Sequence, residues 1–156
     1  MSKSKERIEQ IVSYSKDLKL TMIHQCFQEQ IKEATQKDAS YEEFLALLLQ
    51  KEWDSRQESA QYNRIRRADF PYKKHLEDLL INELPEDAQK KYKQLKTLEF
   101  IKEGRNLILA GSPGTGKSHM AIGLGMKACE EGYKVWFTTV PLLINQLKEC
   151  RSAKTL

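Results

Sequence analysis

Cysteine and histidine are scarce in this chain, and neither occurs at the spacing of a metal site or a disulfide framework. Its 156 residues hold three cysteines, Cys26, Cys129 and Cys150, which form no Cys-x-x-Cys pair and leave an odd total. The three histidines are equally scattered. We therefore expect reduced, buried thiols in a cytoplasmic protein, without a structural metal centre.

A long apolar run is also missing. No stretch approaches the roughly 18 apolar residues of a membrane span, and the opening MSKSKERIEQ lacks the apolar segment of a signal peptide. We expect a soluble protein with no membrane partner. Hydrophobic content of 40% and charged content of 31% permit one medium domain or two small ones. No helix-turn-helix, zinc-finger or RNA-recognition signature is present.

The most informative feature is the octapeptide GSPGTGKS at residues 111–118. It matches the phosphate-binding pattern G-x-x-x-x-G-K-[ST]. Residues 106–110 form a short apolar run that predicts a buried strand before the loop, and residues 117–131 have helical composition up to Gly132. This order of strand, loop and helix predicts a P-loop rather than a glycine-rich turn that binds nothing.

The predicted nucleotide site follows from this loop. Its glycines let backbone N–H groups turn toward phosphate, and the N-terminus of the following helix adds a positive dipole end. Lys117 is expected to reach the β- and γ-phosphates, as the one catalytic residue, and Ser118 to ligate Mg²⁺. ATP is the default nucleotide because no NKxD guanine motif occurs. The predicted cofactor-binding residues are Gly111, Ser112, Pro113, Gly114, Thr115, Gly116, Lys117, Ser118 and His119, with a place on the helix surface as the alternative for His119.

Acidic residues are nearly absent after the loop. The three that follow it are Glu130, Glu131 and Glu149, and none comes after an apolar strand. A P-loop hydrolase needs such a residue to hold the Mg²⁺ shell and to position the attacking water. We therefore expect this chain alone to hydrolyse ATP poorly or not at all. The expected explanation is a shortened gene product, a cut fragment or a half-domain completed by another chain.

The predicted fold class is α/β. Residues 1–84 are expected to form an all-helical region, and residues 85–156 the first part, β-α-β-α, of a P-loop nucleotide-binding domain. The second strand of that domain is placed at residues 133–139, with a final helix from Pro141. Two parallel strands are few for a stable sheet, so part of their apolar surface is expected to remain uncovered.

Several helices are predicted in the first hundred residues. Apolar spacing indicates one up to about Leu18 and a second from Met22 to Ala34. Ser40 and Glu43 have capping-box spacing at the start of a long helix that reaches about Ala68. Another helix is expected over residues 85–102, with a proline in its first turn.

The end of the long helix and the segment after it are basic. Only Asp69 opposes five cationic side chains, which are Arg64, Arg66, Arg67, Lys73 and Lys74. Such a cluster can release counterions from DNA phosphates, so these five residues are the predicted DNA contacts. The alternative is a solvated helix end whose arginines pair with nearby acids.

Two stretches of the sequence carry a family resemblance. LEFIKEGRNLILAGSPGTGKSHMAIGLGMKACEEGYKVWFTT, residues 98–139, resembles the IstB-type helper ATPases of bacterial insertion-sequence transposition. FLALLLQKEWDSRQESAQYNRIRRADFP, residues 44–71, is similar to the helical N-terminal region of the same family, as is the region around residues 20–34. The GTGKSH run and the following FTT are also similar to replicative helicase loaders of the DnaC type. Both groups are AAA+ ATPases.

The resemblance implies a cytoplasmic AAA+ protein that binds ATP and Mg²⁺, assembles on DNA as a homo-oligomer and regulates a partner transposase. The family continues with a Walker B strand, a sensor and an arginine finger, which this sequence does not show, so oligomer assembly is doubtful for this chain. Three alternatives stay open. They are a DnaC-like helicase loader, a non-catalytic DNA-binding module with a vestigial P-loop, and a transposon remnant that does not fold stably.

Overall fold

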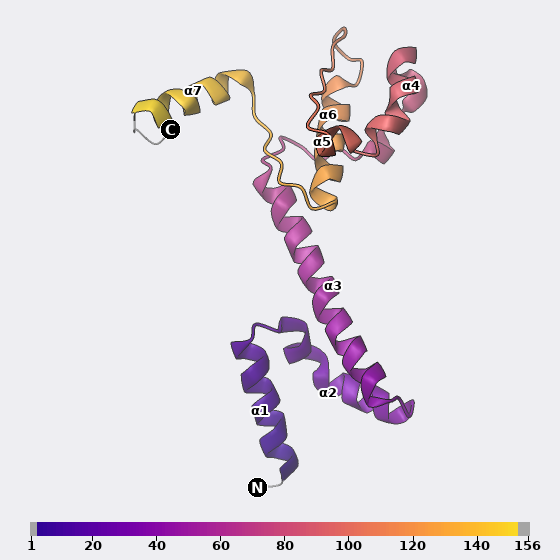
Figure 1. Cartoon of the computed structure of the whole chain (residues 1–156), viewed down its shortest axis with the longest axis vertical. Helices are drawn as coiled ribbons and strands as arrows, with labels where there is room; N and C mark the ends of the chain where they lie inside the picture. The colour runs from indigo at the N-terminus through magenta and orange to yellow at the C-terminus, as the bar shows by residue number, and fades with distance from the viewer. Residues whose placement is uncertain (1–2, 153–156) are drawn as a thin grey trace. The chain divides into compact units, whose positions relative to one another are not determined.

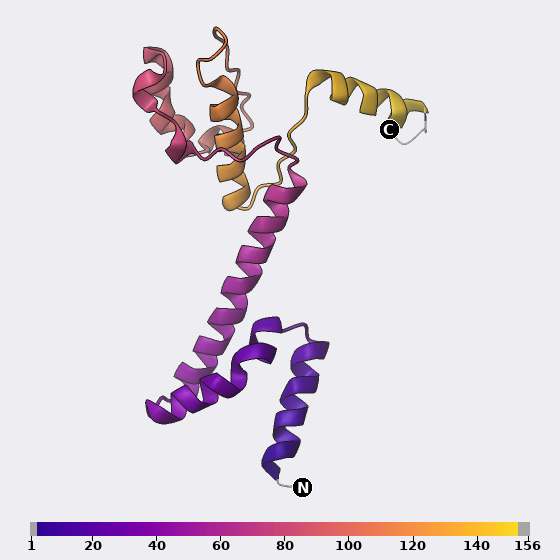
Figure 2. The same cartoon turned by 180° about the vertical axis from the view of Figure 1, so that it is seen from behind.

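The computed structural model describes residues 3–152, and these residues are organised as helices joined by turns and irregular segments (Figures 1 and 2). They belong to two compact units that divide at Ala60 and Gln61, called unit 1 and unit 2 below. In chain order the α-helices are α1 (Lys3–Asp17), α2 (Thr21–Gln36), α3 (Tyr41–Arg67), α4 (Glu86–Leu95), α5 (Glu99–Lys102), α6 (Lys117–Glu130) and α7 (Val140–Ser152). Two short 3₁₀ helices, η1 (Leu76–Asp78) and η2 (Ile81–Glu83), precede α4.

The prediction of an α/β fold was wrong. No β-strand is present within residues 3–152, and the two predicted strands, residues 106–110 and 133–139, are irregular. The predicted β-α-β-α arrangement is therefore absent from the described part of the chain. The predicted functional domains, 1–84 and 85–156, extend at each end into residues outside this part, and their boundary stays a prediction.

The two apolar segments do not pair, because each finds other partners. In residues 133–139, Tyr133 N–H donates to the carbonyl oxygen of Ala128, and Phe137 N–H donates to that of Ala68. In residues 106–110, Leu109 packs against the core of unit 2, whereas Ile108 is 86% exposed. Two short runs cannot cover both faces of a parallel pair, so helix packing decides their conformation instead.

Most of the predicted helices are confirmed. The capping box forms as expected: Ser40 N–H donates to Glu43 Oε2 over 2.9 Å, and Glu43 N–H donates to Ser40 Oγ over 3.2 Å. The helix predicted over residues 85–102 is instead divided into α4 and α5. Leu98, between them, has a φ of 58°, in the left-handed region that interrupts a right-handed helix.

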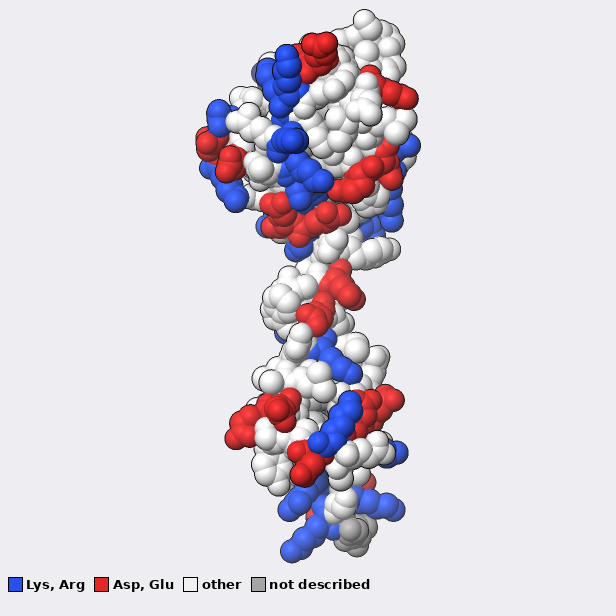
Figure 3. All heavy atoms as spheres, turned by 90° about the vertical axis from the view of Figure 1, so that its right-hand side faces the viewer, with Lys and Arg blue, Asp and Glu red and all other residues white. Residues whose placement is uncertain are grey.

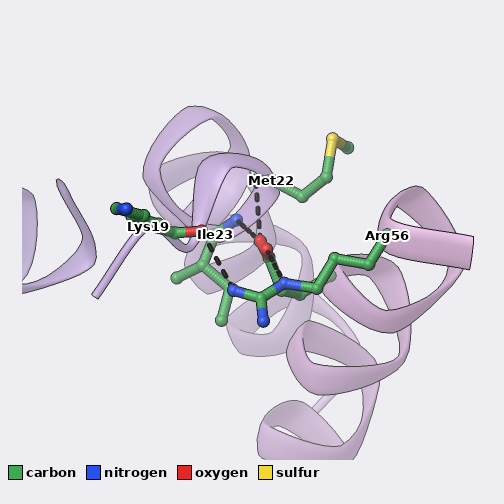
Figure 4. A network of polar contacts seen from close by, with 5 residues as sticks. Lys19, Met22, Ile23 and Arg56 are labelled. Atoms are coloured by element: carbon green, nitrogen blue, oxygen red, sulfur yellow. Dashed lines mark hydrogen bonds and ion pairs between the residues drawn. The ribbon is translucent and has the colours of Figure 1, made fainter. Parts of the chain in front are cut away.

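In unit 1 a carboxylate on α3 holds the start of α2 (Figure 4). Glu52 Oε2 accepts hydrogen bonds from the N–H groups of Met22 and Ile23, at 2.8 and 3.3 Å. These are first-turn donors of α2, whose N-cap Leu20 offers no side-chain acceptor. Arg56 joins the same network: its Nε donates to Glu52 Oε1 over 3.0 Å, and its guanidinium also donates to the carbonyl oxygen of Lys19.

The interior of unit 1 is small and partly polar. Phe27 and Leu48 are its buried apolar side chains, beside the buried polar residues Ser15, Gln30 and Glu52. Ser15 Oγ donates to the carbonyl oxygen of Val12, but Gln30 Oε1 has no hydrogen-bond partner among the described residues. The interior of unit 1 is therefore formed by polar as well as apolar side chains.

Unit 2 has the larger apolar core, built around α6. The buried members are supplied by the segment 76–84, α4, the α4–α5 turn and α6: Leu76, Leu79, Leu84, Tyr92, Leu98, Met120, Leu124 and Ala128. On the face drawn in Figure 3, Lys and Arg side chains lie among Asp and Glu side chains. None of the helices between residues 3 and 152 has the length and apolar character needed to cross a membrane.

Candidate nucleotide-binding site

The loop of residues 111–116 leads directly into α6, as the sequence predicted. Gly114 and Gly116 have φ angles of 83° and 76°, in the left-handed region that favours glycine. A Cβ on Gly116 would also lie 3.2 Å from a methyl group of Leu84. The structure therefore needs glycine at this position both for the turn and for packing against the core.

The side chains of the loop are linked to one another. Thr115 Oγ1 donates to the carbonyl oxygen of Ser112 over 2.9 Å. Lys117 Nζ donates to the same carbonyl oxygen over 2.6 Å and lies 3.4 Å from Thr115 Oγ1. The ammonium group thus lies over the loop at the N-terminus of α6, where both the charge and the helix dipole attract an anion. A phosphate at this position would compete with Ser112 for the ammonium group.

Ser118 occupies the first turn of α6 and is exposed. No group of three His, Cys, Asp or Glu side chains that could hold a metal ion occurs among residues 3–152. Because Mg²⁺ usually keeps several waters and binds substrate phosphates, a single hydroxyl beside the loop fits a cation carried by a nucleotide. The donor set does not fit a dedicated, all-protein Mg²⁺ site.

Two acidic residues that follow the loop, Glu130 and Glu131, lie far from it along α6, and His119 has a hydrogen-bond partner outside the loop. Glu130 and Glu131 are at the opposite end of α6, where Glu131 pairs with Lys127 over 3.1 Å. His119 Nε2 lies 2.9 Å from the carbonyl oxygen of His75, so this ring nitrogen is the donor of a hydrogen bond. The ring of His119 therefore holds the segment before η1 against α6.

A mostly apolar pocket of about 230 Å³ adjoins the loop. Thr115, Gly116 and Lys117 form one side, and the polar side chains of Asp87 and Lys91 reach it from α4. Its apolar lining comes from residues 84–85, α4, residues 107–110 and α6, through Leu84, Pro85, Ala88, Leu95, Leu107, Ile108, Leu109, Ala110 and Met120. The sequence did not point to this pocket, because its walls come from segments without a shared motif.

The structure gives the five predicted DNA contacts different surroundings. Arg64 is half-buried, and its Nε donates to the carbonyl oxygen of Cys129 over 2.7 Å. Arg66 and Lys73 line a second pocket, whereas Arg67 and Lys74 are exposed and are not part of its lining. The basic cluster is thus divided between a helix-end contact, a pocket and open surface.

The second pocket has a volume of about 330 Å³. Besides Arg66 and Lys73 it is lined by aromatic, apolar and other polar side chains, namely Tyr62, Ile65, Asp69, Phe70, His75 and Met126. Sequence reasoning did not single out Tyr62 or Phe70. Their spacing along α3 and the following turn placed them near the arginines, but the wall that Met126 adds comes from α6 and has no local signal.

Arg64 also affects the thiol of Cys129, the residue whose carbonyl oxygen it contacts. Burial raises the pKa of Cys129, and the guanidinium of Arg64 opposes that change without cancelling it. Cys129 is fully buried. The thiol therefore stays protonated near neutral pH. The expected burial is confirmed for Cys129 but was wrong for Cys150, which is exposed, and Cys26 is only partly buried.

A family model described as IstB-like ATP binding protein matches residues 13–155. A Pseudomonas aeruginosa protein, named as an ATP-binding protein of insertion sequence IS21, is 35% identical over 126 residues, covering 81% of this chain and 48% of the relative. A Geobacillus stearothermophilus protein, named as an ATP-binding protein of insertion sequence IS5376, is 33% identical over 140 residues. This match covers 90% of this chain and 56% of the relative. The chain spans about half the length of these two relatives.

Proposed function

This chain belongs to the family of IstB-like ATP binding proteins, and from that premise we propose that it binds ATP at residues 111–118 as a helper of insertion-sequence transposition. The observation that carries the proposal is the position of Lys117, whose ammonium group lies over the loop at the N-terminus of α6. Two relatives are named as ATP-binding proteins of insertion sequences, which supports the same assignment.

In this proposal the triphosphate lies against the loop and the first turn of α6. Lys117 exchanges its bond to Ser112 for one to phosphate, and Ser118 ligates a Mg²⁺ ion that arrives with the nucleotide. The backbone N–H groups of Ser112 and of residues 114–118 supply further donors, as in other anion-binding loops. Lys117 thus neutralises phosphate charge.

The adjoining apolar pocket takes the nucleoside. Thr115, Gly116 and Lys117 of the loop region line this pocket, which supports a nucleoside there when the phosphates lie on the loop. Its apolar walls suit the faces of a purine, and Asp87 and Lys91 can orient polar edges. We propose nucleotide binding and not hydrolysis. Hydrolysis needs an acidic residue near the phosphates, and Glu130 and Glu131 lie at the end of α6 that is far from the loop.

DNA and a transposase are the proposed macromolecular partners. The exposed cations Arg66, Arg67, Lys73 and Lys74 lie in unit 2, close in sequence to one another. Contacts of such side chains with phosphate supply affinity that falls as salt rises. The names of two relatives assign them to insertion sequences, which supports a transposase as the protein partner.

The test is a titration of the chain with a fluorescent ATP analogue and Mg²⁺. Replacing Lys117 by Ala is expected to weaken binding at least about tenfold, because a hydrogen bond to a charged group contributes roughly 1.5–3 kcal/mol. Lys134→Ala is the matched control, since Lys134 is exposed and outside the loop. Chelation of Mg²⁺ is expected to weaken binding by the parent chain as well.

Equal affinity in the parent chain and Lys117→Ala would show that the nucleotide binds elsewhere. Absence of saturable binding by the parent chain would contradict the nucleotide assignment and favour a vestigial loop. For the partner, pull-down of a replicative helicase instead of a transposase would favour a helicase loader.

A further inference from the structure

The pocket formed by Tyr62, Arg66, Phe70, Lys73 and Met126 has surroundings that suit one nucleotide better than a duplex. We propose that it takes a single unpaired base of DNA, with the base inside against Tyr62 and Phe70 and the adjoining phosphate at the rim, on Arg66 and Lys73. This inference rests on the DNA binding proposed above and names the form of DNA that this site recognises.

The wall on α3 is a regular helix face. Ile65 and Arg66 lie three and four residues after Tyr62 on α3, and Asp69 follows in the turn that ends this helix. Side chains with this spacing lie on the same side of a helix. The aromatic ring of Tyr62, which is 62% exposed, is therefore presented beside the guanidinium group of Arg66.

The opposite side of the pocket is fixed by packing. Phe70 lies 6.0 Å from Phe137, ring centre to ring centre, and close to the backbone of α6, since a Cβ on Gly125 would lie 2.9 Å from its ring. Met126 is buried, and its sulfur accepts a hydrogen bond from the N–H of Lys74 over 3.4 Å. A pocket whose floor is already packed needs little ordering on binding, which favours affinity.

Charge decides which part of a nucleotide enters. Asp69 is part of the lining and disfavours an anion inside the pocket. His75 Nδ1 lies 4.0 Å from Glu130 Oε1, so this carboxylate adds negative charge on that side of the rim. Arg66 and Lys73 are exposed, and neither forms a salt bridge within residues 3–152. The neutral base therefore fits inside and the phosphate outside.

Size and chemistry select an unpaired base. A volume of about 330 Å³ is at the lower end of the range for small-molecule sites and cannot admit a double helix. A paired base has both faces covered by its neighbours and must leave the stack before it can meet a protein ring. Stacking on an aromatic side chain beside a cationic groove is a general way to bind single-stranded DNA, whatever its sequence.

The experiment compares a single-stranded oligonucleotide with a duplex of the same sequence, using fluorescence anisotropy and the full chain. A second set of oligonucleotides carries 2-aminopurine, whose fluorescence falls when it stacks on an aromatic ring. Tyr62→Ala is expected to weaken single-strand binding about tenfold, to leave duplex binding within about twofold and to abolish the 2-aminopurine signal change. Tyr72→Ala is the matched control, because Tyr72 is exposed in the same segment but does not line the pocket.

Arg66→Gln provides a second variant, with Lys90→Gln on the exposed surface of α4 as its control. Arg66→Gln is expected to weaken single-strand binding and to reduce its dependence on salt concentration.

If Tyr62→Ala bound both forms of DNA like the parent chain, or lost both equally, the base pocket would be refuted while DNA binding itself stood. If the parent chain bound neither form, both the DNA proposal and the base pocket would fall.

Discussion

Arg64 donates from Nε to the carbonyl oxygen of Cys129 over 2.7 Å, joining the end of α3 to the last turn of α6. The last carbonyl groups of a helix have no partner within the helix, so an arginine is a suitable donor there. The positive charge also interacts favourably with the C-terminal end of the helix dipole. This arginine therefore stabilises α6, the helix that follows the loop of residues 111–116.

Replacing Arg64 by Ala is expected to lower the free energy of unfolding by about 1–2 kcal/mol, since a half-exposed hydrogen bond from a charged donor is lost. Thermal unfolding followed by circular dichroism measures the change. Arg67→Ala is the control, because Arg67 is exposed on the same turn and is expected to change stability by less than about 0.5 kcal/mol. Similar losses in the two variants would refute the structural role of Arg64.

The carboxylate of Glu52 makes the stability of unit 1 depend on pH. Burial acts to raise the pKa of Glu52, but hydrogen bonds from Arg56 and from the N–H groups of Ile23 and Met22 outweigh it, so the pKa lies below its ordinary value. Stability from this group is therefore fully present above the ordinary pKa and is lost as pH falls through the lowered value.

Glu52→Gln is accordingly expected to destabilise unit 1 by about 1–2 kcal/mol at neutral pH, because it removes charge-assisted bonds. The difference from the parent chain should shrink as pH falls below about 4.5, the ordinary value for this carboxyl. Unfolding curves from neutral to acidic pH provide the measurement, with exposed Glu58→Gln as the control. A difference that did not change with pH would contradict the assigned pKa direction.

Gln30 offers a route to higher stability. It is 2% exposed, and its Oε1 has no hydrogen-bond partner in the described structure. Since an unsatisfied buried acceptor costs about 1–3 kcal/mol, Gln30→Met, which has a similar volume, is expected to raise the free energy of unfolding by about 1 kcal/mol. Gln28→Met, on the exposed side of α2, is the control for added hydrophobicity. Destabilisation by Gln30→Met would show that the amide makes a needed contact.

Two glycines within α6 differ in what a methyl group would meet. A Cβ on Gly123 would lie 2.8 Å from a methyl group of Leu76 and 3.2 Å from its backbone nitrogen, whereas one on Gly125 would meet only the tip of the Phe70 ring at 2.9 Å and Val135 at 3.5 Å. A ring can turn aside more easily than backbone can move. Gly123→Ala is therefore expected to cost about 1–3 kcal/mol and Gly125→Ala clearly less, as denaturant titration would show. The reverse order would contradict the packing of η1 on α6.

The sequence predicted the helices well because their signals are local. Apolar spacing, the Ser40–Glu43 capping box and the glycines around α6 each act within a few residues. The P-loop could be located for the same reason, since its pattern lies within one loop and the start of one helix. Its position before α6 is observed, while nucleotide binding there stays a prediction.

The two predicted strands, residues 106–110 and 133–139, are irregular, because the conformation of a short apolar run depends on its partners and not on the run alone. A short apolar run such as residues 106–110 is equally consistent with a strand and with an irregular segment packed on helices. The same limit applies to Arg64 and Tyr62. The partner of Arg64 is Cys129, and the wall that completes the Tyr62 pocket is Met126, both supplied by α6, far along the chain.

The contacts along α6 have a mechanical consequence. The helix carries Lys117 at one end and the Cys129 carbonyl near the other, and its 14 residues extend roughly 21 Å. Between these ends, at Gly123 and Gly125, Leu76 and Phe70 press close to its backbone. A tilt of α6 about these contacts would carry its two ends in opposite directions. A phosphate that shifted the first turn would therefore strain or relax the bond from Arg64, some 20 Å away.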